Sequence, residues 1–166
     1  MIKTGFTLFE VLITFAIIAA IACMTIPQIL PYITEYSLNK NAQYLEQTIK
    51  EARSLAIKKS CLVYIDLSQA TTNHDEFGGL VQIKQNDGTV LSENYLDKNI
   101  FFDSASSTIA NNKIFFDYLG EPVGNLNKPE NFTEPNNKIS VKYERSNLLR
   151  SITISPITGA TSILPN

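Results

Sequence analysis

The feature that most constrains this chain is an uninterrupted apolar run near its amino terminus. No charged side chain occurs between Val11 and Thr34, and most positions hold Ile, Leu, Val, Ala, Phe, Cys or Met. About twenty residues in an α-helix, each rising roughly 1.5 Å, cross the roughly 30 Å hydrocarbon core of a bilayer. A secretory signal has a shorter apolar core followed by a cleavage site between small residues. The run therefore predicts a membrane-spanning helix.

One acidic residue, Glu10, stands at the start of this run. An ionised carboxylate at the edge of a lipid-facing helix is costly unless it finds a partner, which makes Glu10 a candidate functional residue. The simpler interpretation is a single-pass anchor that carries a glutamate near its cytoplasmic end.

The residues around Glu10 form a specific motif. Gly5 and Phe6 are followed by Thr-Leu-Phe, then by Glu10 and the apolar run. This segment resembles the class III signal of type IV pilins and of the pseudopilins of type II secretion. The resemblance implies that a prepilin peptidase cuts between Gly5 and Phe6 and N-methylates the new amine of Phe6. It also implies that Glu10 offsets the amine of a neighbouring subunit in a filament, since opposite charges in lipid are tolerable together and costly apart.

Charge near the membrane predicts the topology. Lys3 lies on the amino side of the run and a large domain follows it, so the amino terminus should be cytoplasmic and the rest periplasmic. We expect a leader peptide at residues 1–5, a transmembrane and assembly segment at 6–32, and an extracytoplasmic pilin-like domain at 33–166. The resemblance implies residence in the inner (cytoplasmic) membrane, and in a pilus or pseudopilus after assembly.

Two prolines, Pro27 and Pro31, lie near the outer end of the apolar run. Proline removes an intrahelical hydrogen bond and clashes with the preceding turn, so a kink or local unwinding is predicted around Met24 to Pro31. A proline at the position of Pro27 is common in the family that the chain resembles.

Beyond the prolines, apolar residues recur at spacings of four and three, which predicts a helix with one apolar stripe. The stripe comprises Leu38, Ala42, Leu45, Ile49, Ala52 and Ala56. We expect one long helix from about Phe6 to about Lys59, with the stripe packed under a sheet. The stretch from Glu51 to Lys59 resembles the end of this helix in the GspH/FimT family of minor pseudopilins and minor pilins.

From Cys61 onward the apolar period changes to two, which is typical of strands. Strands are predicted at 61–67, 79–85, 89–96, 99–103, 113–119, 139–145, 148–155 and 160–164, with an exposed loop over 120–137. A long helix followed by antiparallel strands predicts an α+β fold of the pilin type, with a membrane-spanning inner half and an amphipathic outer half of the helix. The resemblance implies a β-sandwich-like pair of sheets on the helix.

Residues that carry chemistry are sparse. His74 is the only histidine, and the two cysteines, Cys23 and Cys61, lie far apart in sequence, so a disulfide between them is not expected. The spacings of metal ligands and of phosphate-binding loops are absent from the sequence. We therefore expect no metal, no cofactor and no enzymatic activity.

Two functions remain beside an inert anchor. The first is a minor pilin or pseudopilin, a structural subunit of a type II secretion pseudopilus or a type IV pilus. Its partners would be other pilin subunits, prepilin peptidase, the inner-membrane assembly platform and membrane lipid. Both kinds of filament use the same amino-terminal signal, so the motif does not distinguish them.

The second is a DNA-binding minor pilin that acts in DNA uptake for natural transformation, as part of the family does with basic residues near its carboxyl end. The corresponding residues here are Lys138, Lys142, Arg145 and Arg150. Phosphate binding needs clustered Lys or Arg. However, Ala160-Thr-Ser follows Gly159 where an arginine-rich turn would be wanted, and residues 33–166 carry a formal charge of −2.

The cleavage motif leads to a direct prediction about the mature chain. In cells with an active prepilin peptidase, we expect the protein to lose residues 1–5 and to begin at Phe6 with a methylated amine. Intact-mass and amino-terminal analysis of the membrane-extracted protein checks this, and retention of Met1 would contradict it.

Overall fold

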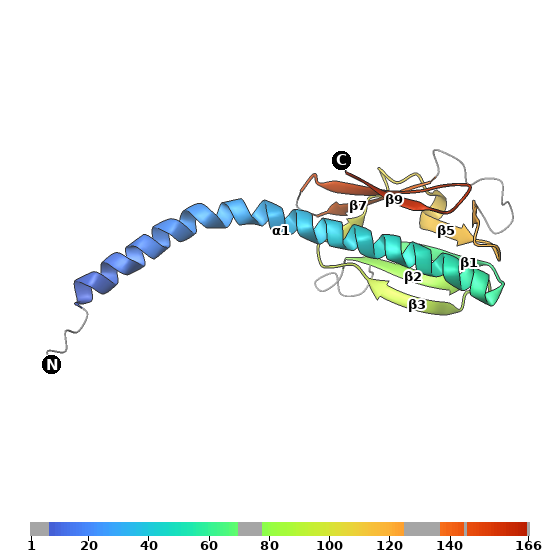
Figure 1. Ribbon diagram of the computed structural model, residues 1–166, viewed down its shortest axis with the longest axis horizontal. Coiled ribbons are helices and arrows are strands. Elements are labelled where there is room, and N and C mark those ends of the chain that lie inside the picture. The colour runs from blue at the N-terminus through green and yellow to red at the C-terminus, as the bar shows by residue number, and fades with distance from the viewer. Residues whose placement is uncertain (1–6, 70–77, 125–136, 145, 166) are drawn as a thin grey trace. The chain divides into compact units, whose positions relative to one another are not determined.

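The computed structural model describes residues 7–69, 78–124, 137–144 and 146–165. The chain divides into two compact units, Met1–Tyr36 and Ser37–Asn166. A single helix, α1 (Leu8–Lys59), supplies the helical part of the first unit and the first element of the second (Figure 1). The predicted helix, from about Phe6 to about Lys59, is confirmed over these described residues.

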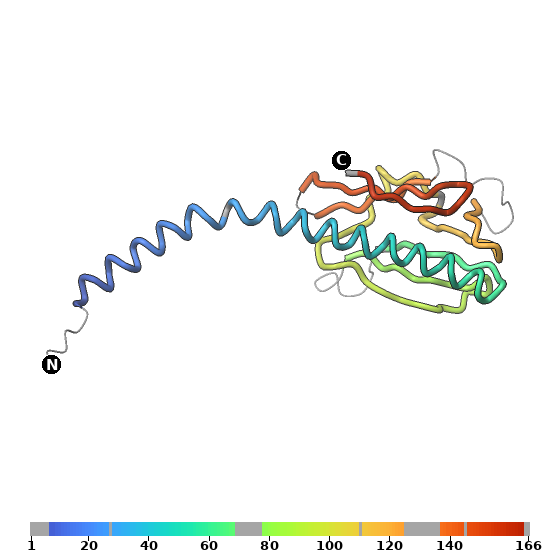
Figure 2. Tube along the Cα trace, viewed as in Figure 1, coloured from blue at the N-terminus to red at the C-terminus, as the bar shows by residue number. Residues whose placement is uncertain are grey.

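Antiparallel strands make up the rest of the second unit. In the part of the chain that the structure describes they are β1 (Val63–Gln69), β2 (Gly79–Gln85), β3 (Val90–Tyr95), β4 (Ile100–Phe102), β5 (Lys113–Phe116), β6 (Pro122–Val123), β7 (Lys138–Tyr143), β8 (Leu149–Ile154) and β9 (Thr161–Pro165), with a short 3-10 helix, η1 (Ala110–Asn112), before β5. They form two sheets of order β3-β2-β1-β5-β6 and β4-β7-β8-β9. Figure 2 follows the chain trace from the blue start of α1 to the red carboxyl-terminal strands. The α+β class and the pair of antiparallel sheets are confirmed.

The structure corrects the predicted loop over 120–137 at its start. Pro122 and Val123 form β6, which pairs with Phe116 and Phe115 at the edge of the first sheet. Proline is tolerated at a sheet edge because its missing N–H need not serve a second neighbouring strand. The remainder of that loop, from 125 to 136, lies outside the described residues.

The preceding strand is shorter than predicted, because the chain turns after Phe116. The amide of Asp117 donates to the Glu121 carbonyl at 3.0 Å, and the amide of Gly120 donates to the Asp117 carbonyl at 2.9 Å. Gly120 has a φ of 77°, a left-handed conformation that glycine adopts without a Cβ penalty. The turn therefore places Tyr118 and Leu119 on the surface rather than in a strand.

The apolar stripe of α1 forms one wall of the core. All six predicted residues, Leu38, Ala42, Leu45, Ile49, Ala52 and Ala56, are fully buried. They share one buried cluster with side chains of the first sheet, such as Ile65, and of the second sheet, such as Ile152. Full burial of one Leu or Ile side chain stabilises a fold by about 1.5–3 kcal/mol, so this stripe ties both sheets to the helix.

Polar contacts near the start of the second unit connect α1 to the link between β3 and β4. Buried Asn41 accepts the Asp97 amide at 2.9 Å and donates through Nδ2 to the Asp97 carboxylate at 3.0 Å. Lys40 forms an ion pair with the same carboxylate at 2.9 Å. Asp97 lies more than fifty residues further along the chain than Lys40 and Asn41. These bonds therefore hold together two segments that are distant in sequence, a contact that the sequence pattern did not predict.

This arrangement predicts an acid-sensitive contribution to stability. Partial burial raises the pKa of the Asp97 carboxyl, but hydrogen bonds from Lys40 and Asn41 outweigh burial and leave the pKa below its ordinary value. A lowered folded-state pKa stabilises the fold above the unfolded pKa of about 4, and this gain is lost as the pH falls through the folded value. Between pH 5 and pH 3, the wild type should therefore lose more stability than Asp97→Asn.

The measurement is the urea concentration at the midpoint of unfolding, for the full chain in detergent at pH 5 and at pH 3. Near-ultraviolet circular dichroism monitors the unfolding. Asp103→Asn serves as the matched control, because Asp103 accepts a backbone amide of its own turn and makes no ion pair within the described residues. Equal pH dependence in the wild type and Asp97→Asn would contradict the prediction.

Candidate functional site: the amino-terminal helix

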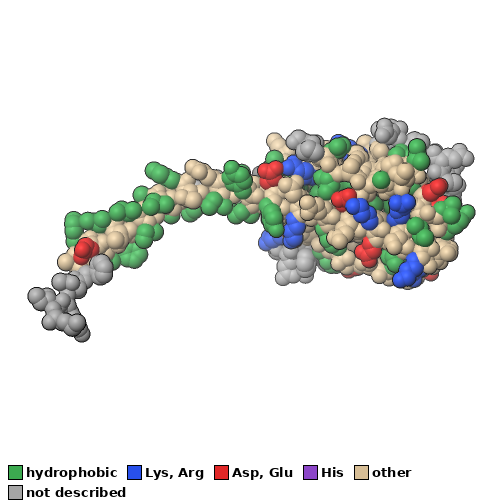
Figure 3. Space-filling model, viewed as in Figure 1, with side chains coloured by type: hydrophobic (Ala, Val, Ile, Leu, Met, Phe, Trp, Pro, Cys, Tyr) green, Lys and Arg blue, Asp and Glu red, His purple; other side chains and the backbone are tan. Residues whose placement is uncertain are grey.

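The first half of α1 is suited to a membrane by length and composition. Leu8–Ile26 comprises 19 residues with a mean hydropathy of 2.4 in its most apolar window, and no residue of that window is buried. At roughly 1.5 Å per residue this stretch is about 28 Å long, close to the thickness of a hydrocarbon core. Figure 3 shows hydrophobic side chains along this helix. The exposed apolar helix fits a membrane-anchored protein.

Glu10 lies in the first turn of α1, where it forms a capping box with Thr7. The Thr7 amide donates to Oε2 of Glu10 at 3.0 Å, and the Thr7 hydroxyl lies 3.1 Å from the same oxygen. In return, the Glu10 amide donates to Oγ1 of Thr7 at 3.3 Å. These bonds satisfy backbone donors that the start of a helix leaves without partners.

The capping box leaves part of Glu10 available. Both bonds from Thr7 end on Oε2, and within the described residues no lysine or arginine forms an ion pair with Glu10. The bonds from Thr7 therefore orient the Glu10 carboxylate, but no cation among the described residues compensates its charge. In lipid, such a charge favours a cationic partner.

Glu10 was expected at this site, whereas Thr7 was not. The signal was present, because threonine followed three residues later by glutamate, just before an apolar run, is a helix-start pattern. Three further threonines bond back to their own helix: Thr14 to the Val11 carbonyl, Thr25 to the Ile21 carbonyl and Thr34 to the Leu30 carbonyl, at 2.8 to 3.0 Å. Hydroxyls satisfied in this way are compatible with a lipid environment.

The other amino-terminal predictions remain open. Gly5 and Phe6 lie outside the described residues, so the cleavage junction stays a prediction. α1 is helical through Pro27 and Pro31, and no unwound residue interrupts its described length. The kink proposed for these prolines also stays a prediction.

The structure does not gather the predicted basic residues on one surface. Lys142 pairs with Leu149 across β7 and β8, whereas Arg150 pairs with Val141, and successive strand residues point to opposite faces. Lys138 and Lys142 therefore share one face of the sheet, and Arg150 lies on the other. Arg145 lies outside the described residues.

Arg150 has a structural role that its charge did not suggest. Its side chain is 8% exposed, and its Nε donates to Oδ1 of Asn39 on α1 at 2.7 Å. Its Nη1 also donates to the Leu149 carbonyl at 3.2 Å. This arginine joins the second sheet to the helix, and a phosphate group has little access to it.

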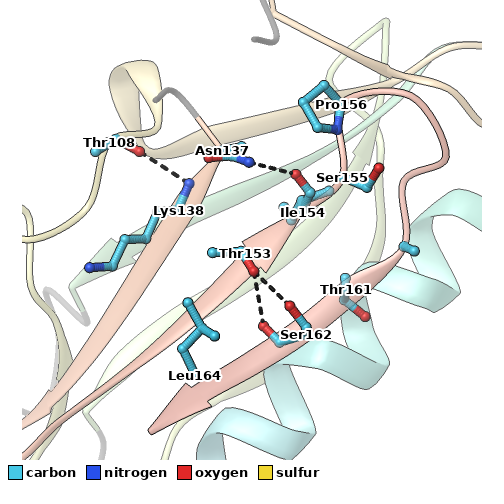
Figure 4. Close-up of a pocket in the computed structure, with 11 residues that line it drawn as sticks. Thr108, Asn137, Lys138, Thr153, Ile154, Ser155, Pro156, Thr161, Ser162 and Leu164 are labelled. Atoms are coloured by element: carbon cyan, nitrogen blue, oxygen red, sulfur yellow. Dashed lines mark hydrogen bonds between the residues drawn. The ribbon is translucent and has the colours of Figure 1, made fainter. Parts of the chain in front are cut away.

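An open hollow lies on the outer face of the second sheet, beside β8 and β9 (Figure 4). It is an open groove of about 690 Å³ lined mainly by small polar side chains. Thr153 and Ser162 face each other across the strands with their hydroxyls 2.7 Å apart. Among the described residues that line the groove, Lys138 carries a charge and none is His, Cys, Asp or Glu.

Other candidates for chemistry do not come together in the described residues. No group of three or more His, Cys, Asp or Glu side chains is arranged to hold a metal ion within the part of the chain that the structure covers. Both cysteines are free: Cys61 is half-buried against the core, and Cys23 is exposed on the apolar helix. His74 lies outside the described residues.

The fold and the helix together define a class of protein. The fold has the arrangement expected of a pilin: an exposed apolar helix at the amino terminus continues as a helix that packs on antiparallel sheets. Glu10 and its capping partner Thr7 stand at the start of that helix.

Comparison with known proteins finds similar solved structures. Two crystal structures of the type IV minor pilin FimU from Pseudomonas aeruginosa, in space groups P21 and P65, are similar to the chain. The TM-scores are 0.49 and 0.47, the sequence identities 17% and 18%, and the matches cover 81% and 77% of this chain and 93% of each FimU chain. No protein-family model and no curated protein matched the sequence.

The capping box generates a prediction about the start of α1. Replacing an N-cap threonine by alanine costs about 1 kcal/mol, which is about fivefold in an opening equilibrium. In Thr7→Ala, we therefore expect about fivefold faster hydrogen exchange at the amides of the first turn, with little change further along the helix. Thr7→Ser retains the hydroxyl and should exchange like the wild type. Exchange measured by mass spectrometry on the detergent-solubilised chain checks this, and unchanged rates in Thr7→Ala would contradict it.

Proposed function

We propose that this protein is a minor pilin or pseudopilin, a structural subunit that assembles into a type IV pilus or a type II secretion pseudopilus through its amino-terminal helix. In this role prepilin peptidase removes residues 1–5 and methylates Phe6, and an inner-membrane assembly platform adds the subunit to the filament. The helix anchors the unassembled subunit in the inner membrane, with a cytoplasmic amino terminus and a periplasmic second unit.

One observation carries the proposal: a single carboxylate, Glu10, stands directly before the uncharged and largely exposed run from Val11 to Thr34. An inert anchor gains a helix cap from Glu10 but nothing from its charge, because a charge makes insertion into lipid less favourable. The capping bonds account for Oε2 but leave the negative charge without a described cation. A methylated amine at Phe6 of a neighbouring subunit would supply that cation in a filament.

The DNA-uptake alternative has less support from the geometry. A phosphate-binding surface needs several cations on one face, and its affinity scales with the number of phosphates neutralised. Lys138 and Lys142 share a face, but buried Arg150 is bonded to Asn39 on the opposite side of the sheet. The proposed role is therefore structural rather than catalytic or DNA-binding.

The experiment separates the charge of Glu10 from its capping role. Glu10→Gln retains an oxygen that can accept the Thr7 bonds but removes the charge, whereas Thr7→Ala retains the charge and removes the hydroxyl. If charge pairing drives assembly, Glu10→Gln and Glu10→Leu should insert in the membrane but enter filaments poorly. Thr7→Ala should assemble at close to the normal level.

The measurement compares the amounts of each variant in sheared filament and membrane fractions, in cells that also make the other filament subunits. Equal membrane levels show that insertion is intact and serve as the control. Normal assembly of Glu10→Gln would contradict the proposed charge pairing, as would a Thr7→Ala defect as large as that of Glu10→Gln.

A further inference from the structure

The apolar surface of α1 continues beyond the stretch that is long enough to span a bilayer. Past Ile26, five large apolar side chains of the first unit remain between 47% and 74% exposed. Four of them, Ile29, Tyr32, Ile33 and Tyr36, form what we call the tyrosine face, and the fifth, Leu30, lies beside that face. In water, a cluster of exposed apolar side chains of this size marks a surface that meets another phase or molecule.

The four side chains lie on one side of the helix. Their spacings of three, four and seven residues place them within about 100° of one another, at 100° per residue. Glu35 lies on the other side of the same turns, and the Thr34 hydroxyl is bonded back to the Leu30 carbonyl. The segment therefore has an aromatic, apolar face and a polar face, unlike the uniformly apolar stretch before it.

We propose that the tyrosine face lies against the lipid headgroup layer at the outer surface of the membrane, in the unassembled subunit. Tyrosine suits this layer because its ring is apolar and its hydroxyl remains hydrated, and tyrosines are enriched at membrane–water interfaces. The inference rests on the membrane anchoring proposed above and adds a second lipid contact with different chemistry.

Distances along the helix define the geometry of this contact. At 1.5 Å per residue, Tyr32 is about 9 Å and Tyr36 about 15 Å beyond Ile26, whereas the headgroup layer on each side is only about 5–8 Å thick. A helix along the membrane normal would carry Tyr36 past that layer. A tilt of up to about 40° lowers Tyr36 to about 11 Å beyond Ile26, and helical side chains lean toward the amino end of the helix, which brings the tyrosine rings back toward this layer. Contact on one side is sufficient because both tyrosines lie on that side.

Lipid is the occupant that this surface fits best. The tyrosine face is continuous along α1 with Leu8–Ile26, the stretch that fits the hydrocarbon core. Two hydroxyl-bearing rings in four positions suit a layer that is partly hydrated, whereas a helix packed in hydrocarbon or in a protein core would leave those hydroxyls to be satisfied elsewhere.

The sequence makes this contact directly measurable, because the chain contains no tryptophan. Tyr32→Trp and Tyr36→Trp each introduce a unique fluorophore into the full chain. Each variant is reconstituted in phosphatidylcholine–phosphatidylglycerol vesicles that contain lipids brominated either near the carbonyl end or near the middle of the acyl chain. Phe15→Trp, in the apolar stretch, and Tyr118→Trp, at an exposed turn of the second unit, are the matched controls.

We expect Tyr32→Trp and Tyr36→Trp to emit at shorter wavelength than Tyr118→Trp, and to lose more intensity with the shallow bromine than with the deep bromine. Phe15→Trp should lose more intensity with the deep bromine. If either tyrosine position behaves like Tyr118→Trp, or if both behave like Phe15→Trp, the proposal is overturned while the anchor stands. If Phe15→Trp itself is not quenched, the membrane anchor fails as well.

Discussion

The second unit depends on the burial of one side of α1. Half of the six residues in its stripe are alanines, and all six are fully buried. A small side chain at a fully buried position lets the helix backbone lie close to its neighbours, so larger residues at Ala42, Ala52 or Ala56 would overpack the core. Polar bonds then fix the helix from two directions: Asn41 and Lys40 hold Asp97 after the first sheet's β3, and Asn39 holds Arg150 of the second sheet.

The first unit follows a different physical rule, because no residue of its most apolar stretch is buried by the rest of the described chain. Within the described residues, its threonines bond to their own helix and Glu10 caps the helix start. A segment that satisfies its own polar groups can enter lipid without unfolding. Glu10 is the exception. A neutral residue could cap the helix equally well, whereas Glu10 also brings a charge that favours a cationic partner.

Local periodicity predicted most of the fold, and long-range polar contacts were the main omission. The stripe from Leu38 to Ala56 was expected to pack under a sheet, and it is buried. Val63, Ile65 and Leu67 alternate along β1, as the period of two predicts for a strand, and they are buried as well. The i,i+4 pair of Glu46 and Lys50 was equally predictable and is present at 2.8 Å. Such features depend only on residues that are close in sequence.

Arg150 shows where that reasoning stops. In sequence it is a cation near other cations, and a DNA contact was a reasonable hypothesis, but its partner Asn39 is more than a hundred residues away. The two-residue β6 was missed for a related reason, because Pro122 is acceptable only at a sheet edge and edge position is a property of the folded sheet. The predicted cleavage junction and the proposed assembly role of Glu10 rest on a sequence motif. Both involve other proteins, a peptidase and a neighbouring subunit, so they do not follow from the fold of one chain.

The direction of the buried stripe also has a mechanical consequence. Leu38 to Ala56 form a row parallel to the axis of α1, spanning roughly 27 Å at 1.5 Å per residue. A pull along that axis loads these contacts in shear, all at once, whereas a sideways pull would separate them one by one. A helix packed in this way resists a pull along its axis better than a pull that peels it away from the sheets.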